Sequence, residues 1–112
     1  KADTRTLPEL LIERHDILIE RIGTRLKTHA TETDIARLFI ALVEYRFMRK
    51  CPIKTFRNAL HEQFNEQEIV HERGIQKAYR NLISPLGNSK KLVKDIGEDH
   101  EAIEELKAYL SN

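Results

Sequence analysis

Five histidines and one cysteine are the residues of this 112-residue chain that most readily bind metals or attack substrates. Their spacing matches no known site, because there is no HExxH motif and no second cysteine to complete a zinc site with Cys51. The four glycines are isolated, so there is no glycine-rich loop for phosphate. We therefore expect that the chain is not an enzyme and holds neither a metal nor a cofactor. The histidines are His15, His29, His61, His71 and His100.

The positions of the lysine and arginine residues indicate candidate binding surfaces more clearly. The chain has 19 basic and 18 acidic residues, for a net charge of +1, but the two signs are separated along the sequence. Segments 45–61 and 73–94 contain basic residues and no acid, whereas acids gather in segments 62–72 and 95–105. Because the field of a protein depends on where its charges lie, both basic segments are candidate binding surfaces.

The second basic segment brings three cations to one face of a predicted helix. At about 100° per residue, Arg73, Lys77 and Arg80 fall together, and Gln76 lies beside them. An outer face of guanidinium, ammonium and amide donors suits the major groove of DNA. The predicted nucleic-acid-binding residues are Arg73, Gln76, Lys77, Arg80, Lys90, Lys91 and Lys94.

These residues would make different contacts with double-stranded DNA. The three helical cations would contact phosphates or guanine edges, and Gln76 would read a base. Lys90, Lys91 and Lys94 would anchor the flanking backbone. An ordinary solvated helix surface fits the same pattern, and a net charge of +1 is small for a DNA-binding domain.

The elements that must position these residues are predicted to be helices. Leu, Ile and Ala far outnumber Val, and the charged residues are mostly types that helices accept at little cost. Apolar residues recur at helical spacing over residues 6–26, 35–48, 52–64, 75–83 and 98–110. The 35–48 run is apolar on nearly all sides, which predicts that it is the central helix.

The fold class that follows is all-α, a compact bundle of four to five helices in a single domain over residues 1–112. The pattern is compatible with a helix-turn-helix or winged-helix-like arrangement, with a short hairpin near 86–93 turning at Gly87-Asn88. No apolar run is long enough to cross a membrane, and one cysteine cannot form an internal disulfide. We expect a cytoplasmic domain, and the missing initial Met is consistent with excision from a longer chain.

From Thr31 onward the sequence resembles the C-terminal region of RteC-type regulators of conjugative transposons. The resemblance rests on "TETDIARLFIALVEYRFM", "IKTFRNALHEQF", the aromatic and basic "KAYRNLI" and the final "EELKAYL". It departs from that pattern at "SPLGNSKK" and at the acidic "GEDHEAIEE", where the family has a denser basic cluster. The resemblance implies a helical DNA-binding domain that regulates transcription.

An alternative function is a helical module for protein–protein interaction or dimerisation without nucleic-acid binding. Acidic and basic patches on a nearly neutral chain could dock in register between two copies or with another protein. Ile17 lies off the main apolar stripe of the first predicted helix and could join such a seam.

Overall fold

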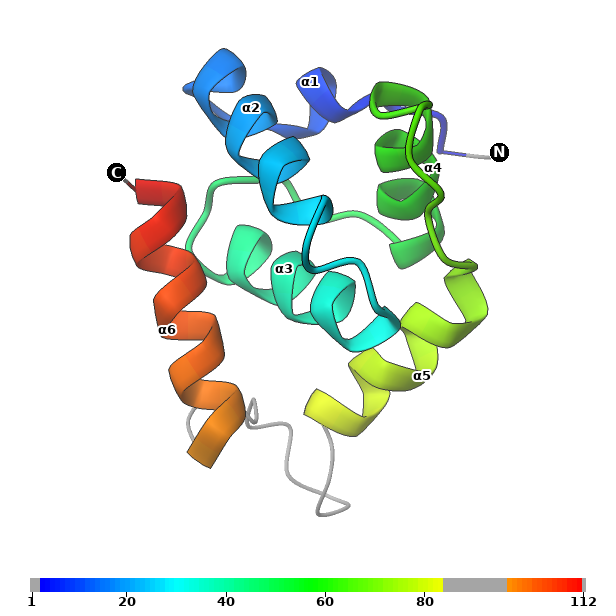
Figure 1. Ribbon diagram of the computed structural model, residues 1–112. Coiled ribbons are helices and arrows are strands. Elements are labelled where there is room, and N and C mark those ends of the chain that lie inside the picture. Colours follow the sequence, from blue (N-terminus) through cyan, green and yellow to red (C-terminus); the bar gives the residue numbers. More distant parts are fainter. Residues whose placement is uncertain (1–2, 84–96, 112) are drawn as a thin grey trace.

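The computed structural model describes residues 3–83 and 97–111, and these form an all-α fold (Figure 1). The helices are α1 (Leu7–Leu10), α2 (His15–Leu26), α3 (Glu32–Glu44), α4 (Ile53–Gln63), α5 (Glu72–Ile83) and α6 (Gly97–Ser111). Helix α3 crosses the middle of the molecule and packs against both α5 and α6, while α1 contacts α2 and α4. The predicted helical class is confirmed. The hairpin expected near 86–93 lies outside the described residues.

The single helix expected over residues 6–26 is wrong, because the chain is interrupted between α1 and α2. Leu11 forms an antiparallel β-bridge with Met48, and the Ile12 N–H donates to the Phe47 carbonyl at 3.1 Å. Arg14 then takes a left-handed conformation, with φ of 56°, before α2 begins. The backbone bonds to a distant segment replace those that a continuous helix would have made.

Helix α3 is central, as predicted, but it ends at Glu44 rather than continuing to Met48. Its start is well defined, since the Asp34 N–H donates to the Thr31 hydroxyl and the Thr31 N–H donates to the Asp34 carboxylate. Its end is marked by a left-handed Arg46, with φ of 60°. Met48 lies beyond that turn, in the segment that forms the β-bridge, and its side chain is buried there. Its apolar type therefore indicates burial and not a position in the helix.

The later helices follow the predicted apolar seams. Phe56 and Leu60 of α4 are fully buried, as are Ile103 and Leu110 of α6. Eight residues, 64–71, connect α4 to α5, whereas the turn of a helix-turn-helix has three to four. The α4–α5 pair is therefore not a compact helix-turn-helix.

Polar contacts attach α6 to α2 beside the shared core. Arg21 donates to the Tyr109 carbonyl at 2.6 Å, and the Tyr109 hydroxyl donates to the Arg21 carbonyl at 2.8 Å. The Arg14 guanidinium donates to the Leu110 and Ser111 carbonyls. Cations at the carboxyl end of α6 also complement the negative end of its helix dipole. These contacts fix α6 across α2 while its other face covers α3.

Candidate nucleic-acid interface

Helix α5 carries the predicted site and is strongly amphipathic. Its first turn is capped by His71, whose Nδ1 accepts a hydrogen bond from the Arg73 N–H at 3.1 Å. Ile75 is fully buried and Leu82 is 6% exposed, so the predicted inner face is confirmed. Tyr79 packs edge-on against Phe39 of α3, with ring centroids 5.5 Å apart. The packing of α5 against α3 therefore determines which residues of α5 point outward.

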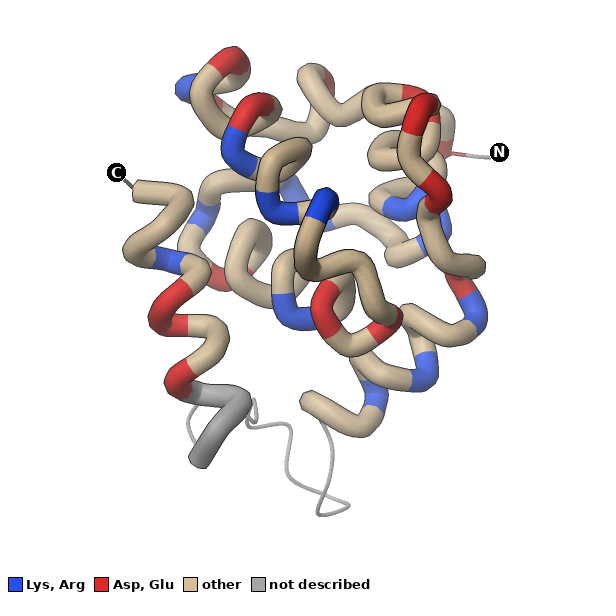
Figure 2. The backbone as a smooth tube through the Cα atoms, in the orientation of Figure 1, with Lys and Arg blue, Asp and Glu red and all other residues tan. Residues whose placement is uncertain are grey.

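Three cations of α5 project from the opposite face. Arg73, Lys77 and Arg80, here called the basic stripe, are all exposed. Within the described residues, none of the three forms an ion pair with a carboxylate. Figure 2 shows the basic positions following one another along α5, while acidic positions gather in the loop before it and on α6. The basic stripe is thus exposed and not neutralised by the acids that the structure describes.

Gln76 is half-buried and opens onto a groove beside the basic stripe. The groove has a volume of about 440 Å³ and runs between α5, α3 and the start of α4. Its lining combines one exposed cation, Lys50, with amide, phenol and apolar groups. The lining residues are Phe39, Val43, Lys50, Cys51, Pro52, Ile53, Gln76 and Tyr79. Lys50 is therefore a neighbour of the site that sequence reasoning did not include.

Burial raises the pKa values of two titratable groups in the groove. Desolvation raises the pKa of the Cys51 thiol to about 11, so this side chain is protonated at neutral pH. Desolvation also raises the pKa of the Tyr79 hydroxyl, with a further contribution from the nearby charge of Glu44. Both groups are neutral under ordinary conditions, and Lys50 supplies the positive charge of the groove.

Acidic side chains of α3 approach α5 at two points. The Glu32 carboxylate lies against Gly74, in the first turn of α5, where a β-carbon would collide with it. Glu44, at the other end of α3, is close enough to Tyr79 to influence the pKa of its hydroxyl. A polyanion on the basic stripe would therefore meet a carboxylate at the Gly74 edge. This contact has no local sequence signal, because Glu32 is about forty residues from Gly74 along the chain.

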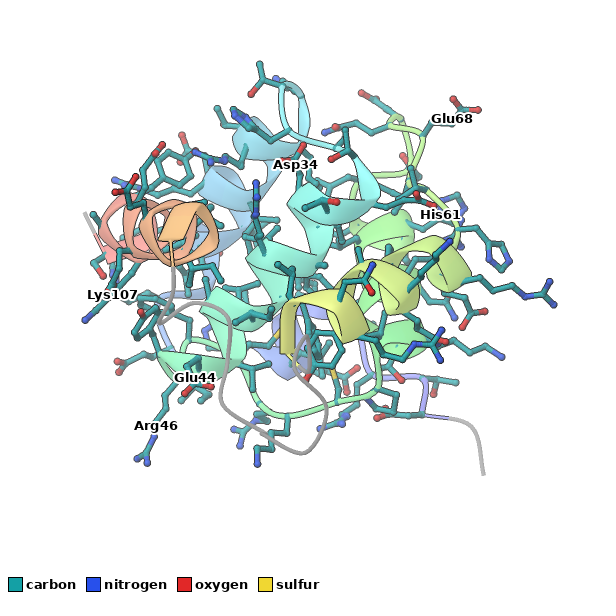
Figure 3. The ribbon with its side chains drawn as sticks, turned by 90° about the horizontal axis from the view of Figure 1, so that it is seen from below. Asp34, Glu44, Arg46, His61, Glu68 and Lys107 are labelled. Atoms are coloured by element: carbon teal, nitrogen blue, oxygen red, sulfur yellow. The ribbon has the colours of Figure 1, made fainter. Side chains whose placement is uncertain are left out.

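The remaining basic residues do not all join this surface. Arg57 donates to the carbonyls of Ile69 and Val70, which fixes the loop before α5. Arg46 extends from the molecule on the same side as Lys107 of α6 (Figure 3). Within the basic segment 45–61, Arg57 therefore has a structural role, and Arg46 lies on a different surface from the basic stripe. The expected phosphate anchors Lys90, Lys91 and Lys94 lie outside the described residues.

Other kinds of site were sought over the same residues. In segments 3–83 and 97–111 no cluster of three or more His, Cys, Asp or Glu side chains could hold a metal ion. None of the described helices has the length and apolar character needed to traverse a lipid bilayer.

Over the residues that the structure describes, the fold is all-helical and α5 carries the exposed basic stripe. The chain belongs to DUF6043, a family of unknown function, whose model matches residues 1–112. No curated protein and no solved structure matches the chain. The resemblance to RteC-type regulators remains a prediction.

Proposed function

We propose that this chain is a DNA-binding regulatory domain that contacts double-stranded DNA through α5. The observation that carries the proposal is the basic stripe, whose three cations are exposed and unpaired with any described carboxylate. A surface needed only for solubility would tolerate intramolecular ion pairs at these positions, whereas phosphate contacts need available cations. A cytoplasmic location and a role without catalysis are part of this proposal.

The proposed contacts follow from the orientation of α5. The basic stripe would neutralise phosphates or donate to guanine edges, and Gln76 would reach a base from the groove side. Lys50 lines the groove with Gln76 and would add a phosphate contact there. Lys90, Lys91 and Lys94 keep their proposed role as anchors of the flanking backbone.

The test is a double charge reversal on the basic stripe. Lys77→Glu combined with Arg80→Glu is expected to weaken binding of a generic duplex at low salt by at least about tenfold, because two phosphate contacts become repulsive. The melting temperature should hardly change, since both side chains are exposed and form no described ion pair. Fluorescence anisotropy with a labelled duplex measures the affinity.

A matched control reverses two exposed lysines that lie away from α5. Lys27→Glu with Lys107→Glu makes the same change in net charge at the end of α2 and on α6. Duplex binding should fall much less than in the α5 variant. The proposal is wrong if the unmodified protein fails to bind duplex at low salt, or if the two double variants lose affinity equally.

Glu32 provides an independent arm of the same experiment. Its carboxylate lies against Gly74 beside the basic stripe, so Glu32→Gln removes a negative charge there with almost no change in side-chain shape. If phosphate lies on the stripe, duplex affinity should rise two- to threefold or so, through weaker repulsion across a hydrated surface. Unchanged affinity in Glu32→Gln, together with an effect of the α5 reversals, would place the duplex away from the first turn of α5.

A protein-interaction module is the alternative function, and one observation favours it. Ile12 and Ile17 are the large apolar side chains most exposed to solvent among the described residues, at 41% and 45%. Ile12 precedes α2 and Ile17 lies in its first turn, and Figure 1 shows α2 on the other side of α3 from α5. Failure of the duplex test combined with capture of a partner through this surface would establish the alternative.

A further inference from the structure

The groove beside the basic stripe has the features of a small-molecule site. Its volume of about 440 Å³ falls within the range of about 300–1,000 Å³ that is usual for such sites. Phe39 and Val43 of α3 and Ile53 of α4 form an apolar floor, and Gln76 and Tyr79 of α5 supply polar atoms. A ligand that fits this groove therefore combines an apolar body with a few polar atoms.

The polar side chains of α5 in the groove have unused hydrogen-bonding capacity. Gln76 and Tyr79 are half-buried. Among the described residues, no protein group forms a hydrogen bond with the side-chain amide of Gln76 or the hydroxyl of Tyr79. Polar groups in such positions usually bond to protein or to water. A ligand that takes the place of this water gains directional bonds at both positions.

The charge of the groove favours an anionic ligand. Lys50 is the sole charged side chain in the described lining, and it pairs with no described carboxylate. The Cys51 thiol is protonated at neutral pH and adds no negative charge. Glu44 is close enough to Tyr79 for its negative charge to act on the hydroxyl. An anionic group is therefore favoured beside Lys50 and disfavoured beside the Tyr79 hydroxyl.

The apolar floor distinguishes an aromatic acid from a nucleic-acid backbone as the occupant. A phosphate backbone could bond to Lys50 and Gln76, but it would leave the apolar floor in contact with water. A flat ring would cover that floor and remove apolar surface from water, which lowers the free energy. A carboxylate on the same ring would supply the negative charge that Lys50 attracts.

We propose that the groove binds a small planar aromatic carboxylate, with its ring on the apolar floor and its carboxylate bonded to the Lys50 ammonium and the Gln76 amide. Both residues are also proposed DNA contacts, so the bound acid and the duplex compete for them. Binding of the acid is independent of DNA binding, whereas the competition rests on the proposed function. The acid would thereby act as an effector that releases the protein from DNA.

A pair of matched probes tests the site directly. The probe is 2-naphthoate, and 2-naphthamide is its neutral analogue of nearly the same shape. In nitrogen-15-labelled protein, 2-naphthoate should shift the assigned amide resonances of Cys51, Gln76 and Tyr79. A dissociation constant of about 1 mM or tighter is expected for a ligand of this size. The amide analogue should bind at least about fivefold more weakly, because it lacks the charge that Lys50 attracts.

Two lysine variants test the role of the charge. Lys50→Gln should weaken 2-naphthoate binding at least about fivefold and leave 2-naphthamide binding unchanged. Lys54→Gln is the matched control, because Lys54 is exposed in the first turn of α4 and is not among the described lining residues. Both variants lower the net charge equally. Absence of 2-naphthoate binding, shifts confined to other surfaces, or equal weakening by the two variants would overturn the proposal.

Fluorescence anisotropy with a labelled duplex, at constant ionic strength, tests the competition. At ten times its dissociation constant, 2-naphthoate should reduce the duplex affinity of the unmodified protein at least about threefold. Unchanged duplex affinity with the groove occupied would overturn the effector role. A protein that binds 2-naphthoate in the groove but binds no duplex would contradict the proposed function of α5 and support the groove site. The two proposals therefore fail separately.

Discussion

At the scale of single residues, Cys51 illustrates how burial determines reactivity. Its thiol is half-buried at the start of α4, and desolvation raises its pKa from 9.0 to about 11. Thiolate is the reactive form, so alkylation by iodoacetamide near pH 8 should be about a hundredfold slower in the folded protein than in denaturant. The half-maximal rate should fall near pH 11. A half-maximum near pH 9 in the folded state would contradict this.

The same shift makes a contribution to stability that changes with pH. Between about pH 9 and pH 11 the unfolded thiol ionises while the folded thiol keeps its proton, so the unfolded state binds fewer protons. The stability of the folded state should therefore decline as pH rises through this window. Cys51→Ser should remove that part of the decline, which denaturant titrations at the two ends of the window would measure.

Residue-level prediction succeeded where exposure follows from helical periodicity alone. Arg73, Lys77 and Arg80 were predicted to share an outer face, and all three are exposed on α5. It failed where a role depends on a distant segment. The Glu32 carboxylate reaches Gly74, and Arg57 donates to loop carbonyls, through tertiary contacts that have no local signature. Whether the stripe binds DNA remains a prediction.

At the scale of elements, Gly23 allows α2 to approach the end of α4. A β-carbon at this buried position would lie 2.7 Å from Cε1 of the Phe64 ring. Glycine to alanine in a helix usually stabilises by up to about 1 kcal/mol, but overpacking here costs about 1–3 kcal/mol. Subtracting the full helix gain, we expect Gly23→Ala to lower the free energy of unfolding by up to about 2 kcal/mol in chemical denaturation.

Two further variants establish the cause of that loss. Gly23→Ala in a Phe64→Leu background should cost much less, because the smaller side chain leaves room for the added methyl group. Gly74→Ala should be neutral or slightly stabilising, since the group in its way is the flexible, exposed Glu32 side chain. Equal losses for Gly23→Ala with and without Phe64 would show that the ring is not responsible.

The sequence was informative about the existence of helices and less informative about their ends. Caps such as Thr31 with Asp34 are local signals, and this one marks the start of α3. The interruption after α1 and the end of α3 both depend on the β-bridge between Leu11 and Met48. Backbone pairing between segments nearly forty residues apart cannot be recognised from the periodicity of either segment.

At the scale of the whole molecule, a net charge of +1 makes salt dependence a discriminating measurement. Only local phosphate contacts can release counterions, because the chain as a whole has little excess charge. Four contacts, three from the basic stripe and one from Lys50, predict a slope of log affinity against log salt near roughly −3.5. Participation of Lys90, Lys91 and Lys94 would steepen it to roughly −6. A slope near zero in anisotropy titrations would exclude phosphate binding.

The single basic stripe on α5 has a consequence for the geometry of DNA reading, should the proposed function hold (Figure 1). Repressors that read palindromes bring two recognition helices about 34 Å apart on one side of a dimer. The extents of one copy of this chain reach only 36 Å, and its described residues offer α5 alone as a reading helix. One copy would therefore cover a single half-site, and a palindrome would require a second copy.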